Sequence, residues 1–382
     1  MTTPAIISSV RAARRIMCVA LASASLTLMP GATWAQRGAS GPPEHADVEP
    51  VNDLPNPYET VRNWGTLPDG RTWGSVSALN IDIDGVHVWV ADRCGANSCA
   101  TSDVDPIVKL DASGNVVQSF GAGLILWPHG MDVDSEGNIW IADARVARGQ
   151  ELERFPEAAG IGSSVMKFSP DGELLLTIGT PGEIGDPPTH LTDPNDVLVA
   201  PDGSIFVGEA HGDQFLDEPG PTAIGRISKY APDGTFIMSF GAWGYEDGQF
   251  RAPHSFAMDS QGRLFIADRG NRRIQIFDLE GRYQRQVFVN PYEGRSLTAA
   301  GLAFSPDPEQ KFIYVADQAN LHIHILNRQT LEILNSWGEL GKEPGNFDAL
   351  HHIAVDSKGN LYTAEAQRNH RAQRFMYAGM SE

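Results

Sequence analysis

Cysteine is scarce in this chain, which has three among its 382 residues. One of them, Cys18, lies in an apolar stretch near the N-terminus, so only Cys94 and Cys99 remain for the rest of the chain. Two thiols exclude a fold held together by a disulfide framework, and four intervening residues without a nearby histidine make a poor zinc site. In an oxidising compartment we expect a local Cys94–Cys99 disulfide that rigidifies the loop beginning at Arg93.

Basic residues are also few, with 29 Lys and Arg against 48 Asp and Glu and a net charge of −19. A protein that binds nucleic acid needs a basic surface to contact phosphates. The charge balance therefore argues against a nucleic-acid partner, and the excess of carboxylates is otherwise accounted for by solubility.

Long apolar runs are absent except at residues 16–29, and this stretch is short for a membrane span. A basic start precedes it, and ATWA followed by Gln36 resembles a cleavage site. We therefore expect a signal peptide at 1–35, export to the periplasm or the medium, and a disordered lead-in at 36–57. Removal of the signal peptide takes away three arginines and no acids, which changes the net charge to −22.

A repeat occupies most of the chain, at 58–378, and leaves a short tail at 379–382. Each unit has four short runs of alternating apolar residues, split by Gly, Asp and Pro turns, and its second run ends in Ala-Asp or a similar pair. Clear copies read WPHGMDVDSEGNIWIAD (127–143), APHSFAMDSQGRLFIAD (252–268) and ALHHIAVDSKGNLYTAE (349–365). Units of about 40 to 50 residues with four antiparallel strands predict a β-propeller.

Six copies are visible, but the sixth lacks its last strand. The segment TVRNWG at 60–65 matches the outer strand that ends in SFG or SWG in other copies. Pairing the two ends of the chain would close the ring and remove its exposed edges. We therefore predict an all-β fold, a six-bladed β-propeller whose N-terminal strand completes the last blade.

Histidine stands at one equivalent position of every second repeat. Aligned on the turn glycines, the six inner strands place at this position Ser77, His129, Asn195, His254, Ala300 and His351. Alternate blades of a closed ring lie about 120° apart, so three imidazoles would converge on the channel axis and leave a fourth direction open, as a catalytic metal requires. We predict a metal site, with zinc as the first choice although nickel, copper or iron also accept nitrogen ligands. The alternative is a ring of histidines that holds water.

Three further polar residues follow the second strand of their repeats and are expected on one rim of the channel. Arg93 and Arg269 come directly after an Ala-Asp pair, and His211 lies two residues after Glu209. The arginines would face a ligand above the metal or bridge neighbouring blades, and His211 would be a general acid or base or an ordinary loop residue. Insertions at 144–164 and 211–225 are expected to wall a pocket over the channel mouth.

These motifs resemble the catalytic core of the peptidyl-α-hydroxyglycine α-amidating lyases, six-bladed propellers of NHL-type repeats. The resemblance covers about residues 58–378, and the family's zinc histidines match WPHG (His129), APHS (His254) and LHHI (His351). Its active-site arginines match Arg93 in DRCG and Arg269 in ADRGNRRIQ. The resemblance implies a zinc lyase that splits an N-(α-hydroxyalkyl) amide into an amide and an aldehyde such as glyoxylate. It implies a small-molecule or peptide substrate with amide and carboxylate groups, and we expect a monomer.

Two positions depart from the family pattern. His211 stands where the family has its catalytic tyrosine, and His352 replaces an acid that helps to bind a structural calcium. The general base and the calcium therefore stay open. Two other functions also remain: a lactonase-type hydrolase, which would use carboxylate and Asn ligands, and a non-catalytic propeller that binds a protein or peptide.

Overall fold

The computed structural model describes residues 56–379 except 101, 217, 221–222 and 291–296. The predicted signal peptide, nearly all of the lead-in and the end of the tail lie outside the described residues. No helix in the described part of the chain combines the length and apolarity needed to cross a bilayer.

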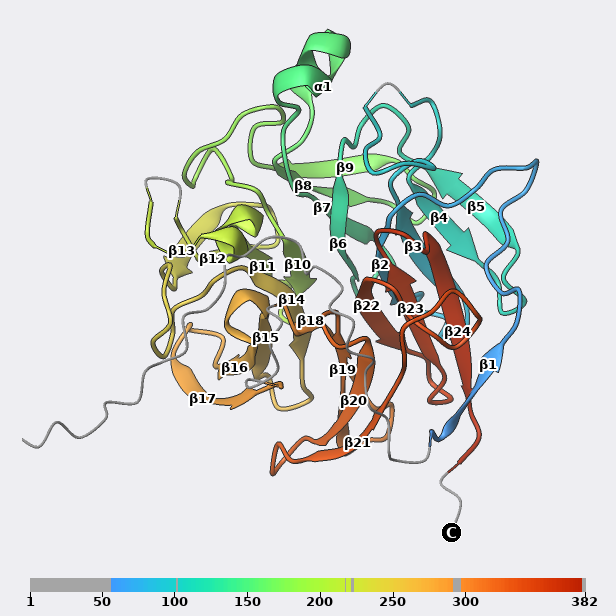
Figure 1. Cartoon of the computed structure of the whole chain (residues 1–382). Helices are drawn as coiled ribbons and strands as arrows, with labels where there is room; N and C mark the ends of the chain where they lie inside the picture. The colour runs from blue at the N-terminus through green and yellow to red at the C-terminus, as the bar shows by residue number, and fades with distance from the viewer. Residues whose placement is uncertain (1–55, 101, 217, 221–222, 291–296, 380–382) are drawn as a thin grey trace, which may run out of the picture. The chain divides into compact units, whose positions relative to one another are not determined.

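The described residues form 24 strands in six four-stranded antiparallel sheets (Figure 1). Blade 1 contains β2 (Val76–Ile81), β3 (Val88–Asp92), β4 (Ile107–Leu110) and β5 (Val116–Phe120). Blade 2 contains β6 (Pro128–Val133), β7 (Ile139–Asp143), β8 (Ser164–Phe168) and β9 (Leu174–Ile178). Blade 3 contains β10 (Asp196–Val199), β11 (Ile205–Gly208), β12 (Ile227–Tyr230) and β13 (Phe236–Phe240).

Blade 4 contains β14 (Pro253–Met258), β15 (Leu264–Asp268), β16 (Arg273–Phe277) and β17 (Tyr283–Phe288). Blade 5 contains β18 (Ala299–Phe304), β19 (Phe312–Asp317), β20 (His322–Asn327) and β21 (Ile333–Trp337). Blade 6 contains β22 (Leu350–Val355), β23 (Leu361–Glu365), β24 (Arg371–Tyr377) and β1 (Tyr58–Val61). The predicted all-β propeller of six blades is confirmed, and its inner strands surround the channel.

Short helices occur only in loops of the described chain. The insertion after β7 carries the α-helix α1 (Gly149–Arg154) and the 3-10 helix η1 (Pro156–Gly160). The loop after β11 carries η2 (His211–Phe215), and η3 (Arg269–Asn271) follows β15. The three predicted metal ligands thus lie in inner strands, namely His129, His254 and His351. The other three predicted site residues follow second strands, namely Arg93, His211 and Arg269.

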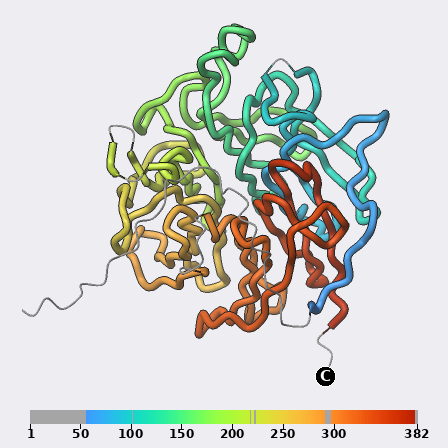
Figure 2. Tube along the Cα trace, in the orientation of Figure 1, coloured from blue at the N-terminus to red at the C-terminus, as the bar shows by residue number. Residues whose placement is uncertain are grey.

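The N-terminal strand closes blade 6, as predicted, but its bounds differ from the prediction. β1 pairs antiparallel with β24, with Tyr58 opposite Tyr377 and Val61 opposite Arg374. Figure 2 shows this blue segment running beside the red C-terminal strand. The predicted strand at 60–65 was wrong after Val61, because Asn63 and Gly65 adopt left-handed φ angles of 59° and 77° that turn the chain out of the sheet.

Trp64 misled the sequence alignment. Its side chain is buried between blades 6 and 1, with its ring centroid 5.1 Å from that of Tyr362 and its indole N–H donating to the Ala112 carbonyl at 3.2 Å. The Trp-Gly pair therefore seals a contact between two blades, whereas Trp337 of the SWG copy lies within a strand.

A buried carboxylate follows or ends the second strand of every blade. These residues are Asp92, Asp143, Glu209, Asp268, Asp317 and Glu365. The Asp143 carboxylate accepts hydrogen bonds from the backbone N–H groups of Leu126 and Trp127 at 2.8 and 2.6 Å. In blades 4 and 6, the equivalent carboxylates of Asp268 and Glu365 accept from the backbone N–H groups of Arg251 and Asp348, each at 2.8 Å. These bonds fix the backbone two or three residues before each predicted metal-binding histidine.

Closure of the ring by β1 leads to a stability prediction. Tyr58 is buried, and its ring packs 5.8 Å from that of Trp337 in blade 5, whereas the next strand residue, Glu59, is exposed. We expect Tyr58→Ala to lower the free energy of unfolding by about 3 kcal/mol, and Glu59→Ala to change it by less than about 0.5 kcal/mol. Urea unfolding of both variants measures this, and equal midpoints would contradict the role of β1 in closing the ring.

Candidate metal centre

The three predicted histidines meet at one end of the channel. His129, His254 and His351 are each the second residue of an inner strand, and they are 1%, 1% and 4% exposed. Their ring centroids are 4.7 to 4.8 Å apart in all three pairs. The alternation in the sequence therefore becomes a nearly equilateral triangle of imidazoles.

Each of these imidazoles is oriented by a backbone carbonyl of the following blade. The Nδ1 atoms of His129, His254 and His351 lie 2.6, 2.7 and 2.6 Å from carbonyl oxygens. These oxygens belong to Asn195, Ala300 and Ser77, which are the residues at the same repeat position in the blades without histidine. A carbonyl only accepts, so Nδ1 carries the proton and Nε2 presents its lone pair.

The free nitrogens fit a transition metal. Nε2 of His129 and of His254 is buried and has no hydrogen-bond partner among the described residues. Burial holds the pKa of all three imidazoles well below the usual histidine value, and neighbouring histidines and arginines lower it further. Neutral imidazoles that bind through Nε2, with Nδ1–H donating to a carbonyl, are the usual form of zinc-ligating histidine.

A fourth histidine, His211, lies beside this triangle. It begins η2, and its ring centroid is 4.6 Å from that of His129, with ring nitrogens of His129, His211 and His254 all within 4.8 Å of one another. Its Nε2 atom is 3.3 Å from both Arg269 Nη2 and Gln214 Nε2, which are donors. The ring is therefore neutral with its proton on Nδ1, and burial followed by the nearby arginines lowers its pKa well below the usual value.

Arg93 is buried on the same side of the channel without a carboxylate partner. Its Nε donates to the Pro128 carbonyl at 3.1 Å and its Nη1 to Asn97 Oδ1 at 2.7 Å. The guanidinium lies 3.3 Å from the ring centroid of Trp127, a stacking contact that holds its plane. Nη2 has no partner among the described residues, and burial lowers the pKa of Arg93 well below its usual value.

Arg269 is similarly buried and similarly unpaired. Its Nη1 donates to Gln318 Oε1 at 2.7 Å, its Nη2 contacts His211, and its Nε has no partner in the described chain. Burial lowers its pKa to about 9. Neither Arg93 nor Arg269 makes a salt bridge with a described residue, although each donates a hydrogen bond to a neutral group of the next blade, Pro128 and Gln318 respectively.

Sequence reasoning missed Arg145, which lies in the insertion after β7. It pairs with both carboxylate oxygens of Glu151 on α1, and its guanidinium lies 5.5 Å from the ring centroid of Trp127. Arg145 lies two residues after Asp143, just as His211 lies two residues after the equivalent Glu209, so its repeat position could have identified it. Trp127, two residues before His129, was not singled out either.

Comparisons with known proteins agree with this architecture. The NHL repeat family model matches residues 250–277, which include His254 and Arg269. Solved structures described as a gluconolactonase and as a streptogramin B lyase superpose with TM-scores of 0.54 and 0.52. The first is 16% identical, and the match covers 85% of this chain and 93% of that one. The second is 14% identical, and the match covers 83% of this chain and 96% of that one. At such identities they show the fold alone. The chain is therefore an NHL-repeat six-bladed propeller.

Curated relatives narrow the assignment. Peptidyl-glycine alpha-amidating monooxygenase A of Xenopus laevis is 31% identical over 328 residues, which cover 78% of this chain and 31% of that protein. Peptidyl-alpha-hydroxyglycine alpha-amidating lyase 1 of Drosophila melanogaster is 26% identical, over 66% of this chain and 45% of its own length. NHL repeat-containing protein 3 of Homo sapiens is 31% identical, over 62% and 63%. The chain is thus a homologue of the amidating lyase family, and it spans about a third of the length of the amidating monooxygenases that it matches.

Because Arg269 has no carboxylate partner, we expect its replacement to change the free energy of unfolding in the opposite direction to replacement of the paired Arg273. Arg273, 1% exposed, donates to Asp268 at 2.8 Å, whereas Arg269, 3% exposed, faces no carboxylate. We expect Arg269→Met to raise the free energy of unfolding by about 1 kcal/mol or more, because an uncompensated buried charge is removed. Arg273→Met should lower it by about 3 kcal/mol, because a buried carboxylate loses its partner. Chemical denaturation of both variants measures this, and a loss of stability in both would show Arg269 to be structural.

Proposed function

We propose that this protein is an exported zinc-dependent lyase that cleaves a carbinolamide, an N-(α-hydroxyalkyl) amide, into an amide and an aldehyde such as glyoxylate. The observation that carries the proposal is the triangle of neutral imidazoles whose Nδ1 atoms donate to backbone carbonyls, which leaves Nε2 for a metal; in His129 and His254 this atom is buried and has no partner among the described residues. The homology with amidating lyases supports the reaction class. The Cys94–Cys99 disulfide in the structure fits an oxidising compartment, and residues 1–35 would direct export to the periplasm or medium.

His129, His254 and His351 would hold the zinc and leave one coordination position open. There the zinc would act as a Lewis acid on the oxygen of the substrate hydroxyl group. The protein contributes a dry site for this chemistry, since all three imidazoles are almost fully buried. Their bonds to backbone carbonyls hold the rings in place before substrate binds.

The arginines would orient the substrate carboxylate. Arg93 and Arg269 each retain an N–H group without a partner among the described residues, and neither is neutralised by a carboxylate. A guanidinium fork suits bidentate binding of a planar carboxylate. An anionic substrate would supply the negative charge that these two arginines lack. The chain has 48 Asp and Glu, yet none of the described carboxylates forms a salt bridge with Arg93 or Arg269.

His211 would move the proton. As a neutral imidazole it can take the hydroxyl proton on Nε2, whose two contacts are long at 3.3 Å. The oxygen electrons then form the aldehyde carbonyl, the C–N bond breaks, and its electron pair stays on the amide nitrogen. The same imidazole returns the proton to that nitrogen, so the atoms balance without an added reagent.

A non-catalytic propeller that binds a protein or peptide is the second candidate, because a propeller fold does not by itself imply catalysis and because NHL repeat-containing protein 3, whose name states no activity, matches this chain at 31% identity. Such a protein needs no metal. A lactonase-type hydrolase would use carboxylate ligands, and the cluster of imidazoles at this end of the channel does not provide them.

The metal and the activity are tested on the same variants. We expect about one zinc per chain in the wild type, and loss of zinc with at least about a hundredfold lower kcat/KM in His254→Ala, since the Lewis acid contributes several kcal/mol. His190→Ala is the matched control, because this imidazole lies at the surface beside Glu183. Elemental analysis and glyoxylate release from an N-acyl-α-hydroxyglycine measure both. A wild type that binds no transition metal would overturn the lyase proposal.

We further propose that this propeller does not hold the calcium of its family at His352. The His352 imidazole is buried, and burial lowers its pKa to about 4. A neutral ring is a poor ligand for a cation that prefers oxygen. The residues therefore do not fit calcium.

The calcium proposal predicts how thermal stability responds to chelation. The Tm of the wild type should be the same in EGTA and in millimolar calcium. In His352→Asp, which restores the acid expected from the family, calcium should raise the Tm by several degrees. A drop in the wild-type Tm in EGTA that calcium reverses would contradict the proposal.

A further inference from the structure

We propose that the end of the channel opposite the histidine triangle is a second binding site, which takes a small organic amine with an apolar substituent. The inference rests on this cavity alone and does not depend on the proposed lyase activity.

The cavity lies at the far ends of the inner strands and has a volume of about 490 Å³. Asp132, on its wall, follows His129 by three residues on β6, which places it about 10 Å further along the strand. None of the three triangle histidines lines the cavity. Its size is that of a pocket for a small molecule.

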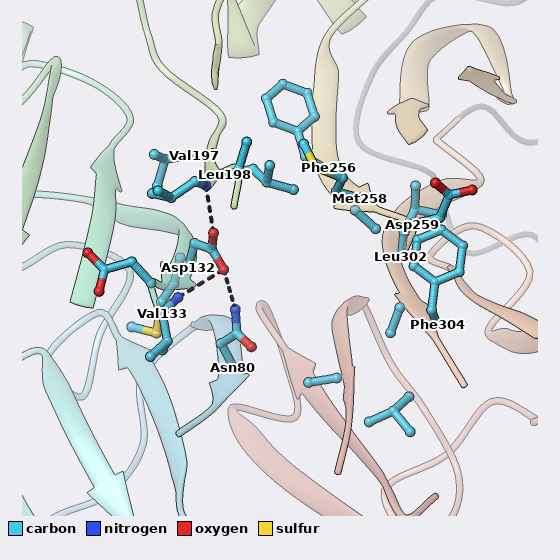
Figure 3. Close-up of a pocket in the computed structure, with 18 of the residues that line it drawn as sticks. Asn80, Asp132, Val133, Val197, Leu198, Phe256, Met258, Asp259, Leu302 and Phe304 are labelled. Carbon is cyan, nitrogen blue, oxygen red and sulfur yellow. Dashed lines mark hydrogen bonds between the residues drawn. The ribbon is translucent and has the colours of Figure 1, made fainter. Parts of the chain in front are cut away.

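Asp132 is a carboxylate without a positive partner. Its Oδ1 accepts from Asn80 Nδ2 and the Val133 N–H, both at 2.9 Å, and its Oδ2 accepts from the Val199 N–H at 2.8 Å (Figure 3). All three donors are neutral, and no Lys, Arg or His forms a salt bridge with it in the described part of the chain. One Oδ2 lone pair is left, and the side chain is only partly buried.

The other acids at the cavity differ from Asp132 because cations neutralise them. Asp134 lies 3.3 Å from Lys167 Nζ, and Asp259 lies 2.8 Å from Arg328 Nη1. Burial raises the pKa of Asp132 to about 6, as expected of a carboxylate that lacks such a partner. At neutral pH it is ionised, and a ligand is the available source of its counter-charge.

His352 supplies a second, independent acceptor. It lines the cavity, is 7% exposed, and has no partner for Nδ1 among the described residues. A neutral imidazole accepts a hydrogen bond on the ring nitrogen that carries no proton, so Nδ1 can serve as an acceptor on the cavity wall. Asp132 provides the counter-charge for an ammonium group, and His352 provides a further polar contact for the ligand.

The rest of the wall is apolar and selects the remainder of the ligand. Figure 3 shows Leu302 and Phe304 across the cavity from Asp132. Further apolar side chains come from the five other inner strands: Leu79, Met131, Leu198, Phe256 and Ile353. A bare metal ion fits poorly, since Asp132 and His352 belong to no group of three metal-ligating side chains in the described chain.

Calorimetric titration of the mature protein with phenethylamine tests the proposal, with phenethyl alcohol as the neutral analogue of similar shape. We expect saturable binding of the amine at one site and at least tenfold weaker binding of the alcohol. Asp132→Asn, which keeps the shape and the acceptor for Val199, should weaken amine binding at least tenfold. Asp171→Asn, which changes an exposed acid elsewhere, should leave it unchanged.

Two further variants locate the site. Ala303→Phe should fill the cavity and abolish binding without touching Asp132, since Ala303 lines the cavity and is only partly buried. His254→Ala should retain amine binding although the metal site is destroyed, which separates this test from that of the lyase. Equal binding of amine and alcohol, no binding at millimolar amine, or an unaffected Asp132→Asn would each overturn the proposal.

Discussion

The hydrogen bond from each channel histidine to a carbonyl of the next blade is the constraint on which the site depends. It joins blades 2 and 3, 4 and 5, and 6 and 1, so three identical contacts surround the axis. The bond fixes the tautomer and aims Nε2 away from the strand, whereas burial keeps the ring neutral by lowering its pKa. Ser77, Asn195 and Ala300, which stand at the same repeat position in the other three blades, supply these carbonyls. Each blade with a histidine is thus followed by a blade that provides the acceptor.

Electrostatics divide the buried arginines into two groups. Arg273 completes a salt bridge that holds its blade together, whereas Arg93 and Arg269 are buried against neutral partners such as Asn97 and Gln318. Burial of a charge without a counter-ion destabilises the protein, so an anionic ligand that pairs with these two guanidiniums would bind more favourably. These two positive charges stand out in a chain of net charge −19.

The two ends of the channel follow different rules. At one end the repeat is used symmetrically, because equivalent positions carry the same imidazole. At the other end it is broken, because Asp132 has no acidic counterpart at the same position in blades 3 to 6, where Leu198, Ala257, Ala303 and Ala354 stand. A symmetric arrangement suits a metal, and a one-sided charge in an apolar wall suits an organic cation.

The sequence by itself determined the six blades, the closing strand and the convergence of the three histidines, because a repeat of fixed period places equivalent residues at equivalent heights around a ring. It also identified Arg93, Arg269 and His211, which follow second strands. Only the tertiary structure decided which nitrogen each imidazole exposes, that the Arg93 and Arg145 guanidiniums lie against the Trp127 ring, and that Trp64 packs between blades instead of extending β1. These features depend on contacts between segments far apart in the chain, and a periodic pattern gives positions but not such contacts.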